Sequence, residues 1–166
     1  MKYGKAFFAG VVGAVIFSIL LAILRLFGLP MNLGVTLGTL LGFAPSNAFW
    51  PGFVFHVAGG GFIGLLYAAV FEFASHKAGP GTGAVVGTIH CVISGLAMMA
   101  LPMLHPMMPN PMTPPGPFAI HYGIGATLTF IALHLIFGAI VGTLYRPVVH
   151  RSEAVGPEHL RPTQSH

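Results

Sequence analysis

The sequence predicts an all-α membrane protein with four transmembrane helices, arranged as two tandem two-helix repeats. Hydrophobic residues make up 55% of the 166 residues, charged residues only 6%, and the mean hydropathy is +0.84. A water-soluble domain of this size would need more charge on its surface. Long uncharged apolar runs follow one another along the chain, as in a lipid-facing helical bundle. A twelve-residue pattern also occurs twice.

The repeated pattern is H-x3-G-x3-G-x2-Y, which covers His56–Tyr67 and returns 78 residues later at His134–Tyr145. At helical pitch the histidine and both glycines fall on one face of each helix. Small residues at every fourth position let two membrane helices approach closely. The glycines predicted to form these packing faces are Gly60, Gly64, Gly138 and Gly142.

The first helix is expected over Ala6–Leu24 as a retained span, because it lacks the cleavage site of a signal peptide. Its segment AGVVG, at residues 9–13, matches GAVVG at residues 83–87, an offset of 74 residues. This offset is close to that of the histidine pattern. The chain is therefore expected to form a single membrane domain over residues 1–166, with repeat 1 at about 6–75 and repeat 2 at about 80–146.

Leu29–Asn47 has no charge, but it is too short and too polar to span a bilayer. Asn32 is the expected N-cap of a short helix, and glycines follow at four-residue spacing. Two interpretations stay open. The segment is either a re-entrant half-helix packed into the bundle or a helix that lies at the membrane interface.

The second helix is expected over Phe49–Ala74, with Trp50 as an interfacial anchor and Pro51 in the first turn. Glu72 lies near its end and is expected to be a second interfacial anchor, since it has no carboxylate partner. Gly79-Pro80-Gly81 then breaks the chain between the two repeats.

The third helix is expected over about Thr82–Leu101, followed by a Pro/Met-rich loop over Pro102–Pro117 that cannot be helical throughout. The fourth helix is expected over about Phe118–Tyr145. Residues 147–166 are polar and contain proline, so a disordered cytoplasmic tail is expected there.

The basic residues predict the orientation in the membrane. With four spans, all but Arg25 fall on one side: Lys2, Lys5, Lys77, Arg146, Arg151 and Arg161. By the positive-inside rule this side is cytoplasmic. The expected location is therefore the cell (inner) membrane, multi-pass, with both termini in the cytoplasm.

Three histidines on three helices, His56, His90 and His134, are expected near the middle of the bilayer. Ionisable residues at that depth are costly and often functional, and facing histidines could ligate a metal or a b-type haem. Alternatively each imidazole donates a hydrogen bond that fixes helix packing. The repeat favours packing, because a duplicated packing pattern needs no ligand to explain it.

A second group of soft ligands lies near the Pro/Met-rich loop, and it would suit an outer copper site. The alternative is that methionines fill an irregular core there. The candidate copper ligands are Met103, His105, Met107, Met108 and His121.

The sequence lacks the residue patterns that mark several other classes of protein. No nucleophile–base set, P-loop or dinucleotide fingerprint is present, so no enzymatic activity is expected. The net charge of +4 comes from residues at helix ends and tails, so it does not predict nucleic-acid binding. The single cysteine, Cys91, excludes an intrachain disulfide.

Met31, Gly34, Gly38, Trp50 and the His56–Tyr67 segment together carry a family resemblance. The chain resembles small uncharacterised bacterial four-helix integral membrane proteins, a domain of unknown function with a tandem H-x3-G-x3-G-x2-Y repeat. The resemblance implies the same four-helix, two-repeat fold. It brings no activity with it.

The function expected from these features is non-enzymatic. The favoured interpretation is an accessory subunit that packs against a larger membrane complex, respiratory or otherwise redox-active. One alternative is a copper- or haem-binding membrane protein that uses histidine and methionine, and another is a small transporter. The expected partners are membrane lipid and other membrane-protein subunits, with no nucleic acid.

Overall fold

A computed structural model of the chain describes residues 1–108 and 112–146, and every regular element in these two ranges is helical. Four helical segments are long and apolar enough to cross a membrane. These segments are Tyr3–Leu26, Phe49–Ser75, Pro80–Leu104 and Ile124–Tyr145. The all-α class and the four apolar helices agree with the prediction from the sequence. The tail predicted at 147–166, with Arg151 and Arg161, lies outside the described residues.

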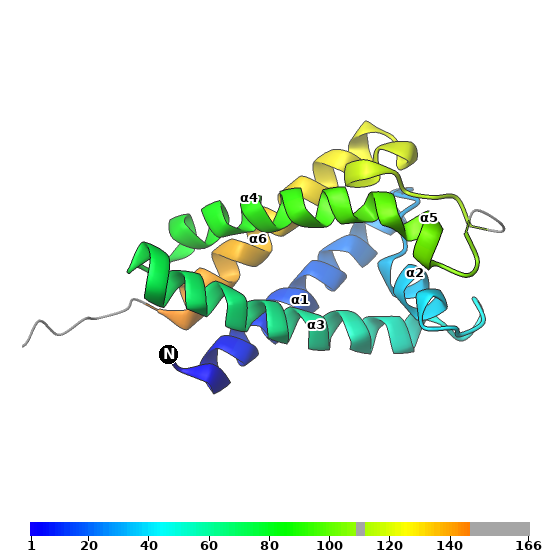
Figure 1. Cartoon of the computed structure of the whole chain (residues 1–166). Helices are drawn as coiled ribbons and strands as arrows, with labels where there is room; N and C mark the ends of the chain where they lie inside the picture. The colour runs from blue at the N-terminus through cyan, green and yellow to red at the C-terminus, as the bar shows by residue number, and fades with distance from the viewer. Residues whose placement is uncertain (109–111, 147–166) are drawn as a thin grey trace, which may run out of the picture.

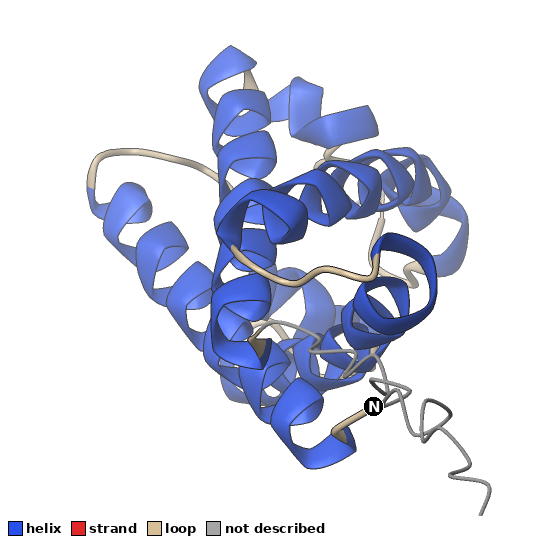
Figure 2. Ribbon diagram, turned by 90° about the vertical axis from the view of Figure 1, so that its left-hand side faces the viewer, coloured by secondary structure: helices blue, strands red, loops and turns tan. Residues whose placement is uncertain are grey.

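The long helices form two packed pairs. Helix α1 (Tyr3–Leu26) packs against α3 (Phe49–Ala69), and α4 (Pro80–Ala97) packs against α6 (Ile124–Tyr145). Contacts between α1 and α6 join the two pairs. In Figure 1, α3 and α4 meet at their short connection on the left and move apart toward the right. Figure 2 shows the same helices from the side on which the N-terminus lies.

Glycines allow the closest approach within the α1–α3 pair. A methyl group added to Gly64 would overlap the Ala6 carbonyl oxygen and the backbone of Gly10. One added to Gly60 would overlap the side chain of Ala14. Small residues on both helices therefore bring the two backbones into contact, as in other membrane helix pairs.

The α4–α6 pair packs in the same manner. A methyl group added to Gly138 would overlap Gly83 and meet the Cα of Gly87, and one on Gly142 would overlap Gly79. All four glycines of the H-x3-G-x3-G-x2-Y segments thus lie against the other helix of their own pair.

Two of the long helices extend past their α-helical parts. Helix α3 continues as a π-helix, η1 (Val70–Ser75), which ends at His76 with φ +51°. Helix α4 continues through a 3₁₀ turn, η2 (Met98–Ala100), into α5 (Leu101–Leu104). The predicted loop therefore starts after Leu104 and not at Pro102. Pro102 is in the first turn of α5, where its missing N–H leaves no helical hydrogen bond unmade.

The last helix starts later than predicted. Pro117–Tyr122 forms a separate 3₁₀ segment, η3, in which Phe118 and Ala119 have φ of +52° and +61°. Gly123, with φ +93°, then redirects the chain into α6 at Ile124. These left-handed backbone conformations cannot continue a right-handed helix, so the helix predicted from Phe118 begins six residues further on.

The segment between α1 and α3 contains the short helix α2 (Leu33–Leu40). As predicted, Asn32 caps it: its Oδ1 accepts a hydrogen bond from the Val35 N–H at 3.2 Å. Gly34 and Gly38 lie against the first turn of α3, where a Cβ on either would overlap Phe49 or Ala48. Helix α2 is therefore fixed to the start of α3, at the right in Figure 1.

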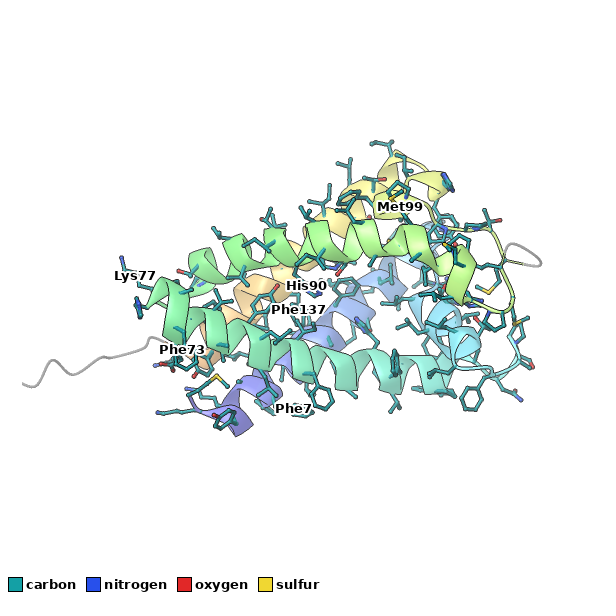
Figure 3. The ribbon with its side chains drawn as sticks, in the orientation of Figure 1. Phe7, Phe73, Lys77, His90, Met99 and Phe137 are labelled. Atoms are coloured by element: carbon teal, nitrogen blue, oxygen red, sulfur yellow. The ribbon has the colours of Figure 1, made fainter. Side chains whose placement is uncertain are left out.

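The opposite end of the bundle holds both ends of the described chain, and we call it the terminal end. The Tyr145 hydroxyl donates to Glu72 Oε1 at 2.7 Å and accepts from the Lys2 N–H at 3.1 Å. Lys77 lies at this end in Figure 3, and Arg146 follows Tyr145 directly. Glu72, on η1, therefore hydrogen-bonds a tyrosine of α6. We call the other end of the bundle, which carries α2 and α5, the α2 end.

Candidate functional site

A cavity of about 560 Å³ lies between the two helix pairs, in the middle of the bundle and toward the α2 end. Residues of α1, α2, α3, α4 and α6 line it, and most of them are aliphatic or aromatic. All three histidines predicted near mid-bilayer are among the lining residues. These are His56, His90 and His134, so the structure brings together at one cavity the candidate ligands that the sequence placed on three separate helices.

His134 projects from α6 and is 6% exposed. Its Nδ1 lies 2.7 Å from the Phe130 carbonyl oxygen. A carbonyl oxygen only accepts hydrogen bonds, so Nδ1 carries the ring proton. In the neutral imidazole Nε2 then has a free lone pair. The ring packs between Phe130 and Phe17, with ring centroids 4.3 and 5.4 Å away.

His90 projects from α4, and its ring centroid lies 4.9 Å from that of His134. The Tyr67 hydroxyl, on α3, is 3.3 Å from His90 Nδ1. Tyr67 is only 2% exposed, and this nitrogen is the hydroxyl's one hydrogen-bond partner among the described residues. Its O–H therefore donates to Nδ1, which places the ring proton of a neutral His90 on Nε2. Figure 3 shows His90 and Phe137 pointing into the space between the helices.

His56 projects from α3, and its Nδ1 lies 3.0 Å from the Ser18 hydroxyl of α1. The ring of Phe17 contacts both His56 and His134, and its centroid lies 5.2 and 5.4 Å from those of the two imidazoles. Phe17 therefore contacts one imidazole on α3 and one on α6.

The three imidazoles share one arrangement. A protein group holds each Nδ1, and no described residue hydrogen-bonds any Nε2. Metal-ligating histidines are oriented through their second nitrogen in this way. In the described ranges, no group of three or more His, Cys, Asp or Glu side chains is placed to hold a metal ion.

Sequence reasoning missed the residues that hold the imidazoles. Tyr67 is the last residue of the first H-x3-G-x3-G-x2-Y segment, and it is buried and bonds to His90. Ser18 and Phe17 belong to no pattern in the sequence. A signal did exist for Ser18, because a hydroxyl inside an apolar helix needs a partner, but that signal does not name the partner.

The predicted outer copper ligands have different surroundings. His105 is 2% exposed and Met108 is buried, whereas Met103 is 87% exposed. His121 is exposed, and its Nδ1 donates to the Pro114 carbonyl oxygen at 3.0 Å. Met107 contacts His105 through its backbone N–H.

Both ring nitrogens of His105 already have partners. Nδ1 accepts from the Met107 N–H at 3.1 Å, so the proton is on Nε2, which lies 3.2 Å from the Thr36 carbonyl oxygen and 2.9 Å from the Thr39 hydroxyl. Thr39 also contacts the sulfur of Met112 at 3.3 Å. A copper ion would have to displace one of these hydrogen bonds. His105 joins the segment after α5 to α2.

No protein-family model, curated protein or solved structure matches this chain in comparisons with each. The resemblance drawn from the sequence stays a prediction.

Proposed function

We propose that this chain is a small, non-enzymatic integral membrane protein that binds a small apolar molecule inside its helix bundle. One observation carries the proposal. Imidazoles from three helices line a single apolar cavity, and the Nε2 atom of each has no protein partner in the part of the chain that the structure describes. Ligand sites combine an apolar wall with a few polar groups in this way.

The size and position of the cavity support this proposal. Ligand pockets typically measure about 300–1,000 Å³, and the cavity volume of about 560 Å³ lies within that range. Phe55 and Phe62 of α3 line the cavity and are 48% and 64% exposed. This exposure supports entry of the ligand sideways from the lipid.

Filling the cavity tests the proposal. Gly59 lines the cavity, and a Cβ added there meets nothing within 4 Å. We expect Gly59→Leu to fold normally and to lose the small molecules that co-purify with the wild type, because its side chain takes their space. Organic extraction and mass spectrometry of the protein, purified in mild detergent, measure this loss.

Gly125→Leu is the matched control. Gly125 also has open space around an added Cβ, but it is on α6 away from the cavity lining. The Gly125→Leu protein should retain the same bound molecules as the wild type. Equal retention by both variants would contradict a ligand site in this cavity.

We further infer that the two helix pairs are tandem repeats. Ala6, Gly10 and Ala14 contact the α3 glycines as Gly79, Gly83 and Gly87 contact the α6 glycines. This equivalence supports an offset of 73 residues between α1 and α4, one less than the AGVVG match suggests.

For α2, buried Thr39 and the cavity-lining residues Thr36 and Leu37 support the re-entrant interpretation.

The other functional interpretations stay proposals. Copper or b-type haem would use His56, His90 or His134, whose held Nδ1 atoms suit axial ligation. An accessory subunit would bury the exposed Phe55 and Phe62 against a partner helix. The glycine faces no longer support that interpretation, since the chain's own helices occupy them. A transporter would use the cavity as its binding site.

We propose the cell (inner) membrane as the location, with both termini in the cytoplasm. Lys2, Lys5, Lys77 and Arg146 at the terminal end, against Arg25 in the last turn of α1, support this orientation.

A further inference from the structure

We infer that the ligand of the cavity carries a hydroxyl group, which binds between His90 and His134. This inference rests on the proposed function and names the chemistry that the site recognises. His90 on α4 and His134 on α6 both line the cavity, and their Nε2 atoms differ in hydrogen-bonding character.

His134 offers an acceptor. Its Nδ1–H donates to the Phe130 carbonyl oxygen, so its Nε2 lone pair is free in the neutral ring. His90 offers a donor. The buried Tyr67 hydroxyl donates to its Nδ1, which leaves the proton on Nε2. The cavity thus presents one donor and one acceptor on neighbouring side chains.

The two rings are close enough to serve one ligand group. Their centroids are 4.9 Å apart, and the ring planes meet at 75°. A hydrogen-bonded oxygen lies about 3 Å from each nitrogen, so one oxygen atom can reach two nitrogens up to about 6 Å apart. The two imidazoles do not hydrogen-bond each other.

A hydroxyl group matches this pair because it donates one hydrogen bond and accepts another. A ketone, an ether or an ionised carboxylate only accepts, so it would leave the lone pair of His134 unpaired. In an apolar cavity an unpaired polar atom weakens binding, since nothing replaces its lost water. The site therefore selects an apolar alcohol or phenol.

Two sources of this chemistry exist in a membrane, namely the phenolic head of a hydroquinone and the hydroxyl of an aliphatic lipid alcohol. The probes are decylhydroquinone, 1-dodecanol and the dimethyl ether of decylhydroquinone. Binding to the wild-type protein in lipid nanodiscs is measured by NMR of ¹⁵N-labelled histidine, with empty nanodiscs as the partition control.

We expect at least one of the two hydroxyl probes to bind about tenfold more tightly than the ether, the effect of about one hydrogen bond. The tighter of the two identifies the source. The free protein should show an unprotonated Nε2 on His134 and a protonated Nε2 on His90, and both signals should shift when a hydroxyl probe binds. His134→Phe should remove the preference over the ether.

Thr88→Val is the control variant, because Thr88 is exposed on α4 and its hydroxyl bonds to its own helix at Ala84. It should keep the preference. Equal binding of the ether and both hydroxyl probes would overturn hydroxyl recognition while the cavity remained a ligand site. Protonation of Nε2 on His134 in the free protein would also overturn it, without any variant. Binding of none of the probes would overturn the proposed function as well.

Discussion

His105 illustrates how one side chain can serve structure where the sequence allowed a metal ligand. It is buried, and its two nitrogens bond to the Met107 N–H and to the Thr36 carbonyl and Thr39 hydroxyl. The imidazole thereby ties the segment after α5 to α2, two segments that are far apart in the sequence. The contact of the Thr39 hydroxyl with the Met112 sulfur is a second link between the same two segments.

Replacement of His105 tests this role. His105→Leu removes the acceptor of the Met107 N–H, whereas the Thr36 carbonyl keeps a hydrogen bond from the Thr39 hydroxyl. We expect a loss of about 1–3 kcal/mol in the free energy of unfolding, measured by denaturant titration in mild detergent.

His121→Leu is the comparison for this variant. The imidazole of His121 is exposed, and it hydrogen-bonds the Pro114 carbonyl oxygen. The free energy of unfolding of the His121→Leu protein should fall by less than about 1 kcal/mol. If the two variants lose equal stability, the buried hydrogen bonds of His105 do not hold the outer segments together.

At the scale of the elements, close packing within each pair depends on the absence of side-chain atoms. Gly64 lies against Ala6 and Gly10 so closely that an added methyl group would overlap backbone atoms. Backbone cannot move aside as the end of a flexible side chain can. A methyl group at this position must therefore push α1 and α3 apart.

We expect Gly64→Ala to lower the free energy of unfolding by about 1–3 kcal/mol, as overpacking usually does. Gly125→Ala should be neutral or slightly stabilising, because its Cβ has open space and alanine favours helix. Denaturant titration of both variants measures the difference. A Gly64→Ala protein as stable as the Gly125→Ala protein would rule out contact between the α1 and α3 backbones at this position.

The sequence predicted those features that depend on composition and spacing along one helix. The four apolar helices, the packing glycines and the mid-helix histidines follow from hydropathy and from helical periodicity. The rotation of one helix against another does not follow, and so the contacts of Phe17 with both His56 and His134 could not be predicted. The late start of α6 depends on left-handed φ values at Phe118 and Ala119, where no glycine or asparagine signals them.

At the scale of the whole molecule, the positions of the charged residues decide how the bundle lies in the membrane. Both described chain ends are at the terminal end, where Tyr145 bonds to Lys2 and Glu72. The loop between α2 and α3, which contains exposed Ser46, is at the other end. A reagent on one side of the membrane should therefore reach Ser46, and a reagent on the other side should reach Lys77.

Cysteine labelling tests this orientation. In a Cys91→Ala background, we expect Ser46→Cys to react with a membrane-impermeant maleimide added to intact cells. Lys77→Cys should react only after the cells are opened, because the proposed orientation places the positive end of the bundle in the cytoplasm. Labelling of the Lys77 position in intact cells, with none at Ser46, would reverse the orientation.

The contact between α1 and α6 has a consequence for how the protein is made. These two helices are the first and last long helices of the described chain, and they join the two pairs. During synthesis α1 and α3 enter the membrane while α6 is still untranslated. Until α6 is inserted, the face of α1 that will contact α6 is exposed to lipid. The wall of the cavity is complete only when α6 arrives with Phe130, His134 and Phe137. A ligand of the proposed kind can therefore take its place while the bundle assembles, as well as by sideways entry into the finished protein.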